Sequence, residues 1–277
     1  MIFNSHTHIG DAFIKLKRKY SLEELVAPGG YKHKMLEMAD EKIILEGMKR
    51  AMDIMEKCGT DVFVDFREGG VEGARLLKKA LAEKKLEAII LGRPKEMRYD
   101  EEEMDSLLDI CQGVGLSSYS DWNEEEIRQI TEHVKKRKKI FALHVSEARR
   151  ENIHEILELK PDFVVHLCKA TEDDINEIVK RKIGVVVCPR ANEYFGLETP
   201  LKILMEKKAI VMLGTDNAMI VKPNIIEEME YVKRKYGLEE KEAFKLISNN
   251  PLKMFGEILK KEAYSYRNEI ESKRCNG

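Results

Sequence analysis

The chain opens with MIFNSHTHIGD (residues 1–11), in which two histidines, His6 and His8, follow a short apolar start. Residues two apart in a β-strand point to the same face of the sheet, so a strand here would project both imidazoles together. The pair is then either a coincidence of packing or one half of a metal site. The rest of the chain has to decide between these two interpretations.

Seven further apolar runs follow this opening, and charged stretches with helical periodicity lie between them. Several runs are continuously apolar and rich in β-branched residues, which is typical of strands buried on both faces of a parallel sheet. Eight strand–helix units in roughly 250 residues predict an α/β fold of the (β/α)8 TIM-barrel type, with a doubly wound open sheet as the main alternative. The runs are TDVFVDF (60–66), LEAIILG (86–92), QGVGLSS (112–118), KIFALHV (139–145), DFVVHLC (162–168), IGVVVCP (183–189) and AIVMLGT (209–215). Helices are predicted at 41–59, 69–85, 123–139, 147–159, 171–182, 199–208 and 223–237.

The spacing of these elements predicts one domain over residues 1–277, with 260–277 as a C-terminal extension, because no long linker, low-complexity segment or repeat interrupts them. Residues 11–40 are an exception to the short spacing. This segment is rich in lysine, contains a Pro-Gly-Gly turn and is long for a loop after a first strand. Long loops in compact domains are often functional lids, and we expect this role here.

The composition predicts a buried core and no excess of either charge. Apolar residues make up 43% of the chain, and 48 Lys and Arg residues nearly balance 50 Asp and Glu residues, for a net charge of −2. We therefore expect a small-molecule substrate, compatible with a homo-oligomer, and no nucleic-acid binding. The five cysteines form no CxxC pair, and we find no signal peptide and no apolar run of ~20 residues. These features predict reduced thiols, no membrane contact and a cytoplasmic location.

Polar residues end several of the later apolar runs, where a barrel would place its catalytic groups. His144 ends the fifth strand, with Glu147 three residues further on; His166 ends the sixth strand, and Asp216 follows the eighth. Each residue alone has a structural explanation. Asp216 can cap the next helix, Glu147 suits a first helical turn, and a lone histidine is commonly hydrogen-bonded in a core. Their joint position on one rim with the opening pair favours a metal site.

The ligand types indicate the chemistry of that site. Three imidazoles and one carboxylate suit one divalent ion, with Zn²⁺ as our assignment and Fe or Mn as alternatives. His6, His8, His144 and Asp216 would hold the ion and leave a position open for water. Such a site lowers the pKa of the bound water to ~7 and makes it a hydroxide nucleophile.

Three carboxyl or imidazole groups could move protons around this nucleophile. Asp216 could accept the proton of the water. Glu147 lies three residues beyond a ligand, so it can face the substrate and carry a proton to a ring nitrogen. His166 could orient the hydroxide or stabilise an oxyanion.

In combination these residues resemble the amidohydrolase superfamily. The motif HVSE (144–147) resembles the His-x-x-Glu of its mononuclear deaminases, a branch that includes adenosine, cytosine, guanine and methylthioadenosine/S-adenosylhomocysteine deaminases. The segments VVHLCKATEDDI, VVVCPRANEYFG, VMLGTDNA and LISNNPLKMFG are similar to consecutive segments of the last group. The resemblance implies a (β/α)8 barrel over residues 1–257, one divalent metal and release of ammonia. Carried over residue by residue, it implies His6, His8, His144 and Asp216 as metal ligands and Glu147, His166 and Asp216 as catalytic groups.

The chain also departs from that pattern. Many relatives carry a β-sandwich built from residues before the first strand and after the barrel. Here His6 lies near the start and the tail is short, so we expect a barrel-only version. The run 112–118 holds no lysine, which argues against a carbamylated lysine bridging two metals. Residues 11–40 match no substrate loop, which leaves the substrate open.

Three residues near the rim are candidate substrate contacts. Trp122 could stack on a base or pack against a helix. Arg190 could hold an anionic group, and Asn192 beside it could bind substrate or form a turn. Arg67 and Glu68, after the second strand, are similar cases.

The sequence therefore predicts a metal-dependent hydrolase, foremost an aminohydrolase that releases ammonia from a nucleobase, nucleoside or similar aminated heterocycle. Hydrolysis of a cyclic amide such as an imidazolone is the alternative, and ammonia release separates the two. A metal-dependent deoxyribonuclease also begins with His-x-His, but it would need an acidic residue at the fourth strand, where Gly115, Leu116 and Ser117 stand. A metal-binding protein without catalysis would need neither Glu147 nor His166.

Overall fold

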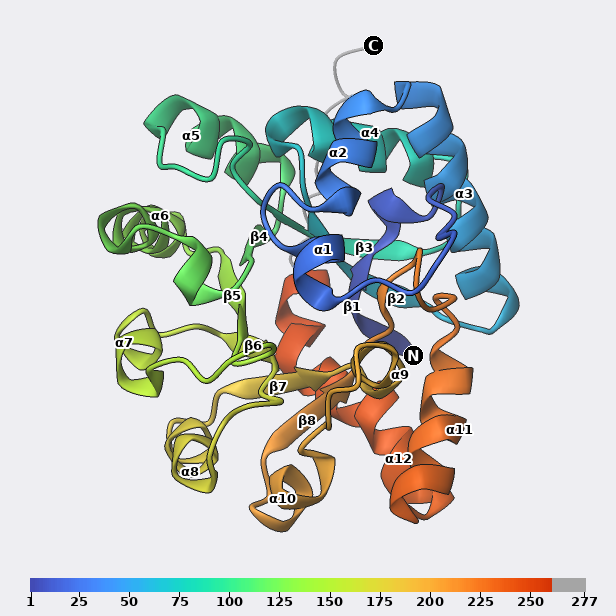
Figure 1. The fold of residues 1–277 in the computed structure, drawn as a ribbon, viewed down its shortest axis with the longest axis vertical. Helices are drawn as coiled ribbons and strands as arrows, with labels where there is room; N and C mark the ends of the chain where they lie inside the picture. The colour runs from blue at the N-terminus through green and yellow to red at the C-terminus, as the bar shows by residue number, and fades with distance from the viewer. Residues whose placement is uncertain (261–277) are drawn as a thin grey trace, which may run out of the picture.

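The apolar runs form parallel strands of one curled sheet in the computed structural model, which describes residues 1–260 (Figure 1). Neighbouring strands follow the order β8-β7-β6-β5-β4-β3-β2-β1-β9, and each pairing is parallel. Each of the eight predicted runs contains a strand, which confirms a parallel α/β fold. The strands are β1 (Phe3–His8), β2 (Val62–Arg67), β3 (Glu87–Gly92), β4 (Gly113–Leu116), β5 (Ile140–Val145), β6 (Phe163–His166), β7 (Gly184–Val187), β8 (Ile210–Leu213) and β9 (Asp216–Asn217).

The short strand β9 is an element that the apolar pattern did not predict. It follows β8 after two residues and pairs with β1, so β1 has a neighbour on each side. The backbone N–H of Gly214 donates to Val187 O (3.0 Å), whereas that of Thr215 donates to His6 O (3.0 Å). A Cβ on Gly214 would lie 2.6 Å from the Cβ of His6, so glycine is required where these segments approach.

Helices surround the sheet because their apolar faces pack on its outer side (Figure 1). In α3, for example, Met48, Ala51, Met52 and Met55 are buried at helical spacing. Each predicted range contains a helix, although the observed helices are shorter, most of all in the range 147–159. The helices are α1 (Leu22–Val26), α2 (Tyr31–Met38), α3 (Glu41–Lys57), α4 (Gly70–Leu81), α5 (Glu101–Ile110), α6 (Glu124–Lys136), α7 (Ile153–Glu158), α8 (Glu172–Lys180), α9 (Pro189–Tyr194), α10 (Leu201–Glu206), α11 (Ile225–Tyr236) and α12 (Glu240–Ile247), with 3-10 turns at Ile9–Asp11 and Tyr119–Asp121.

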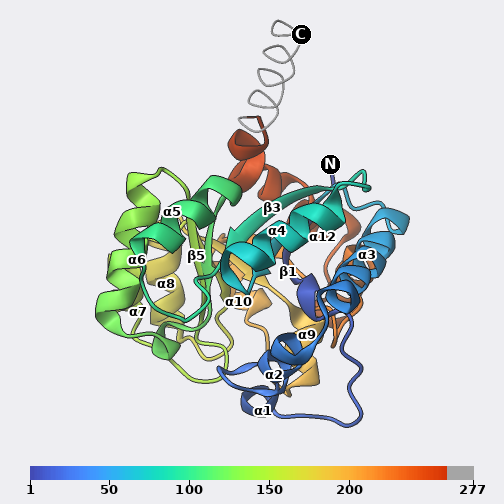
Figure 2. The same cartoon turned by 90° about the horizontal axis from the view of Figure 1, so that it is seen from above.

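The segment 11–40, predicted as a long loop, contains helices α1 and α2. Ser21 begins α1 with a capping box that it shares with Glu24. Both helices project over the sheet around β1 and β3 in Figure 1, and Figure 2 shows them together at one end of the molecule. The predicted extension 260–277 lies, from residue 261 on, outside the described residues. Within residues 1–260, no helix combines the length and the apolar character that a membrane span requires.

The inner face of the sheet is set by residues two apart on each strand. In β2, Val62, Val64 and Phe66 belong to the inner cluster, whereas Phe63 packs outward against helices. In β1, simple alternation from the inward-facing Phe3 would turn His6 and His8 outward. The register shifts between Asn4 and Thr7, where β1 holds one more residue than β2. This bulge returns both histidines to the inner face, and the ring of His6 lies 4.4 Å from that of Phe66.

Candidate metal and catalytic site

Four side chains from β1, β5 and β9 converge at one end of the sheet. The Nε2 atom of His144 lies 3.2 Å from that of His6 and 3.4 Å from that of His8. Asp216 Oδ1 lies 3.5 Å from His6 Nε2 and 3.7 Å from His8 Nε2. All four side chains are buried, and one nitrogen or oxygen atom from each lies within 4.8 Å of the others. The sequence predicted these four residues as a set, and the structure brings them together.

The second ring nitrogens of His8 and His144 show which atom of these two imidazoles faces the centre. His144 Nδ1 lies 2.7 Å from Leu116 O, and His8 Nδ1 lies 3.0 Å from Glu68 Oε1. A carbonyl and a carboxylate only accept hydrogen bonds, so both Nδ1 atoms donate and both Nε2 atoms turn lone pairs inward. Burial lowers the pKa of His6 to about 3, and burial followed by the charges of the other histidines holds the pKa of His144 well below its ordinary value.

This arrangement fits a divalent cation. Two ligand atoms, each ~2.1 Å from a shared ion at tetrahedral angles, lie ~3.4 Å apart, close to the separations among these four groups. Burial alone would raise the pKa of Asp216, but the hydrogen bond of His6 and the charge of His166 outweigh it and keep that pKa low. Inward lone pairs and a carboxylate repel one another unless a cation lies between them. The donor set therefore suits one first-row ion, Zn²⁺ among them.

Glu147 and His166 lie beside these ligands. His166 Nε2 is 3.5 Å from Glu147 Oε1 and 4.0 Å from Asp216 Oδ2, and it has no hydrogen-bond partner among residues 1–260. Its Nδ1 donates to Asn192 Oδ1 (3.1 Å), while Asn192 Nδ2 donates to Thr199 Oγ1 (2.9 Å). The buried Nε2 therefore faces two carboxyl groups across a gap that a substrate or water oxygen could fill.

Glu147 is prepared to hold a proton near neutral pH. Burial raises its pKa from 4.5 to about 7; the charge of His166 opposes this rise, and the charge of Asp216 adds to it. A carboxyl group with such a pKa can donate as well as accept a proton. Because its pKa is raised, Glu147 suits the role of an acid. Because its pKa is lowered, Asp216 suits the role of a base.

Left-handed backbone conformations occur at the same strand ends. Ser146 (φ 50°), His166 (φ 80°) and Asp216 (φ 63°) adopt left-handed conformations that side chains rarely take. Such residues cost about 1–3 kcal/mol each and are typical of functional sites. Here the strain accompanies the turns that bring Glu147, His166 and Asp216 toward one point.

A cavity of about 370 Å³ opens onto three of the four ligands, His8, His144 and Asp216, and onto Glu147 and His166. Leu22, Val26 and Lys32 from α1 and α2 line its other side. The predicted lid segment therefore covers the site, while its opening and closing stay a prediction.

A buried ion-pair network joins the cover to the sheet. Lys32 Nζ lies 2.5 Å from Glu68 Oε1 and donates to Asn217 Oδ1 (3.0 Å). Burial opposes ionisation of Glu68, but the charges of Lys32 and His8 outweigh it and hold its pKa well below the ordinary value. Lys32 thus fixes Glu68, which in turn orients His8. The sequence carried a signal for Glu68, which follows a buried strand, but none for a lysine in a polar helix.

The three predicted substrate contacts have other partners in the structure. Trp122 is buried, and its Nε1 donates to Ser117 Oγ (3.0 Å), a residue of the cavity wall. Arg190 forms ion pairs with Glu228 and Glu227. Asn192 lies behind His166, as described above. Contact of any of the three with substrate stays a prediction.

Two cysteines, Cys168 and Cys188, lie near the site, and both are free thiols. Cys188 is buried, and burial raises the pKa of the Cys188 and Cys168 thiols. Cys188 forms a second candidate ligand group with His166 and Asp216. A thiol with a raised pKa is a weaker ligand than a neutral imidazole, so the histidine set is the better one.

Comparisons with known sequences match most of the chain. The model of the amidohydrolase family matches residues 2–257. Uncharacterized protein MJ0699 of Methanocaldococcus jannaschii is 35% identical over 274 residues, which cover 91% of this chain and 72% of that protein. A protein named "Putative aminohydrolase" from Archaeoglobus fulgidus is 34% identical over 241 residues, covering 86% and 69%.

Solved structures share the fold at low sequence identity. Helicobacter pylori aminofutalosine deaminase, solved with methylthio-coformycin, matches with a TM-score of 0.70 and 14% identity over 92% of this chain and 73% of that one. Adenine deaminase from Arthrobacter aurescens matches with a TM-score of 0.70 and 13% identity, covering 91% and 93%. Atrazine chlorohydrolase from the same species, solved with zinc, has a TM-score of 0.72 and 11% identity, covering 92% and 70%. At these identities the likeness concerns the fold.

Proposed function

Because the chain belongs to the amidohydrolase family, we propose that it is a hydrolytic deaminase that releases ammonia from an aminated heterocycle such as a nucleobase, nucleoside or pterin. The observation that supports this best is the placement of Glu147 and His166 beside four converging ligand atoms. A site that only stores metal needs neither group. Hydrolysis at an aminated ring carbon needs both a base for water and an acid for the ring nitrogen.

We further propose that the sheet is a closed (β/α)8 barrel. Strands β8 and β9 would form one strand interrupted at Gly214 and Thr215, because hydrogen bonds from these residues reach β7 on one side and β1 on the other. Closure places the ends of β1, β5, β6 and β8 on one rim.

His6, His8, His144 and Asp216 would hold the metal ion. A divalent ion there acts as a Lewis acid and makes water a nucleophile near neutral pH. Asp216 accepts one proton of the attacking water, and Glu147 donates its proton to the ring nitrogen next to the carbon under attack. His166 Nε2 orients the new oxygen atom, held in place by the hydrogen bond of Nδ1 to Asn192.

Collapse of the adduct restores both carboxyl groups. Asp216 passes its proton to the amino group, the carbon–nitrogen bond breaks, and ammonia leaves. The second proton of the water returns to Glu147 as the carbonyl forms, and the ring nitrogen keeps the proton it received. Water and the amino compound thereby give the lactam and ammonia.

The test is ammonia release from adenine, guanine, cytosine and pterin compounds and their nucleosides by metal-loaded protein. Glu147→Gln is the negative control, and Glu155→Gln, an exposed carboxylate on α7, is the matched control. We expect release that disappears in the first variant and persists in the second. Hydrolysis of a cyclic amide without ammonia would instead support the alternative chemistry of the same site.

A further inference from the structure

Arg93 is a second polar group at a strand end that the proposed chemistry does not use. It follows β3 directly, and its backbone N–H donates to Arg67 O (3.0 Å). Its side chain lines the cavity that also contains His144, Glu147 and Asp216. The guanidinium is therefore available to a molecule bound beside the candidate metal ligands.

The hydrogen-bond partner of Arg93 carries no negative charge. Arg93 Nη2 donates to His33 Nε2 (3.1 Å), and His33 Nδ1 donates to Ala27 O (3.0 Å). Burial, followed by the charge of Arg93, lowers the pKa of His33, so the imidazole is a neutral acceptor. Within residues 1–260, no carboxylate lies at ion-pair distance from the Arg93 guanidinium.

Two other arginines with low exposure show the contrast. Arg67 pairs with Glu68, and Arg190 pairs with the fully buried Glu228. Buried charges are normally paired because removing them from water is costly. Burial lowers the pKa of Arg93, as expected for a cation without a close counter-ion.

The acidic groups around Arg93 are engaged elsewhere or lie farther away. Glu68 forms ion pairs with His8, Lys32 and Arg67. Glu151 accepts the backbone N–H groups of Ser120 (2.8 Å) and Ser146 (2.7 Å). The charge of the exposed Asp121 acts on Arg93 only from beyond ion-pair distance.

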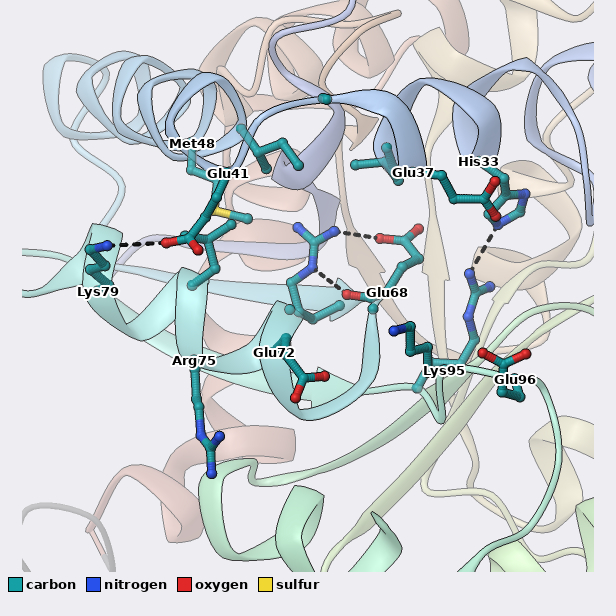
Figure 3. A pocket seen from close by; sticks show the side chains of 18 residues that line it. His33, Glu37, Glu41, Met48, Glu68, Glu72, Arg75, Lys79, Lys95 and Glu96 are labelled. Atoms are coloured by element: carbon teal, nitrogen blue, oxygen red, sulfur yellow. Dashed lines mark hydrogen bonds and ion pairs between the residues drawn. The ribbon is translucent and has the colours of Figure 1, made fainter.

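A second cavity begins where Arg93 lies. It has a volume of about 680 Å³ and shares His33, Glu68 and Arg93 with the first cavity. Figure 3 looks into it, with Glu68 near the centre and His33 at one side, where its hydrogen bond to Arg93 is drawn. A group held by Arg93 would thus lie at the boundary of the two cavities, with room for a further substituent.

We propose that Arg93 binds an anionic group of the substrate, so that the deaminated compound is a heterocycle carrying a carboxylate or a phosphate. This inference rests on the proposed function, since it concerns the substrate of the same site. The planar guanidinium keeps one nitrogen on His33 and offers its remaining N–H groups to two oxygen atoms. The bound anion would be the counter-ion of Arg93, which has no carboxylate at ion-pair distance within residues 1–260.

Matched substrate pairs test this assignment. Adenosine is compared with adenosine 5′-monophosphate, and adenine with its 9-carboxymethyl and 9-carboxypropyl derivatives, in wild type, Arg93→Met, Arg93→Lys and Arg75→Met. Arg75 is an exposed arginine of the second cavity and serves as the control. We expect wild type to favour the anionic member of a pair at least about tenfold in kcat/KM. Arg93→Met should abolish that ratio, Arg93→Lys should restore part of it, and Arg75→Met should leave it unchanged.

Comparing the phosphate compound with the two carboxylate compounds identifies which anion the site binds. Equal ratios in wild type and Arg93→Met would overturn the proposal, as would a ratio that depends on Arg75 instead. In that case deamination of neutral compounds would still stand as the function.

A binding measurement separates the two hypotheses when no compound is deaminated. Inorganic phosphate and benzoate are titrated calorimetrically into the metal-loaded protein and the same variants. Binding of either probe that weakens at least about tenfold in Arg93→Met but not in Arg75→Met supports an anion site even if the deaminase proposal fails. Binding that is equal in both variants, or absent from wild type, would contradict it.

Discussion

The cavity has two walls that are built differently. The wall of strand ends carries its polar residues on fully buried strands such as β5, whose side chains are enclosed along their length. The wall formed by α1 and α2 has little core of its own, since Leu25 is the buried residue of α1 and Lys32 that of α2. Packing therefore fixes the first wall, whereas polar contacts, namely the Lys32 network and the hydrogen bond of His33 to Arg93, connect α2 to the strand ends. Segments with few buried contacts open at lower free-energy cost, which suits a cover over a site.

The largest effect is expected at the strand-end wall. Asp216→Ala removes a ligand and the proposed acceptor of the water proton, so we expect activity to fall by at least about a thousandfold. The metal content, measured by mass spectrometry of the purified protein, should fall as well. A variant that keeps both metal and activity would show that Asp216 has neither role.

The next effect concerns Glu147, which lies on the same wall without being a ligand. Glu147→Gln should lose at least about a hundredfold in rate, because the amide cannot transfer the proton. Its metal content should equal that of wild type, and Glu155→Gln should match wild type in both measurements. Loss of metal from Glu147→Gln would instead place this residue among the ligands.

The raised pKa of Glu147 also predicts a pH dependence of stability in the metal-free protein. The folded chain retains the Glu147 proton up to about pH 7, whereas the unfolded chain releases it near 4.5. The contribution of this group to stability is therefore complete below pH 4.5 and is lost as the pH rises through 7. Relative to Glu147→Gln, wild type should lose on the order of a few kcal/mol over this range. Thermal unfolding of both proteins in chelator gives the difference, and parallel curves would contradict the assigned pKa.

These two walls also differ in how far the sequence predicts them. The strand-end wall follows from continuous apolar runs and the polar residue that ends each one, a rule that gave His144, His166 and Asp216. The same rule applied to β3 would have pointed to Arg93. The bulge in β1 left no signal, because an extra residue does not disturb a short run of mixed polarity. The prediction still pairs His6 with His8 correctly, since both rings lie on the inner face beside Phe66.

The cover could not be predicted because its contacts are distant in sequence and polar. Residues 11–40 lack an apolar stripe, so the sequence predicts a loop where the structure has α1 and α2. The partner of Lys32 is Glu68, and that of Arg190 is Glu228, 38 residues away. The sequence does not distinguish a charged rim residue that faces substrate from one that faces a buried counter-ion. Only the folded chain shows which arginine is paired and which is not.

The smallest expected effect tests whether the two walls are coupled through Lys32. Lys32→Met keeps most of the side-chain length but removes the charge that Glu68 and Asn217 share. Glu68 would then hold His8 less firmly, and such outer partners of a ligand are worth about tenfold or more in metal affinity or rate. We expect roughly tenfold weaker metal binding in Lys32→Met, measured by competition with a chelator, together with faster proteolysis between α1 and α3. Lys34→Met, an exposed lysine on the same helix, should match wild type in both measurements. If Lys32→Met loosens the cover and leaves metal affinity unchanged, the network anchors α2 without orienting His8.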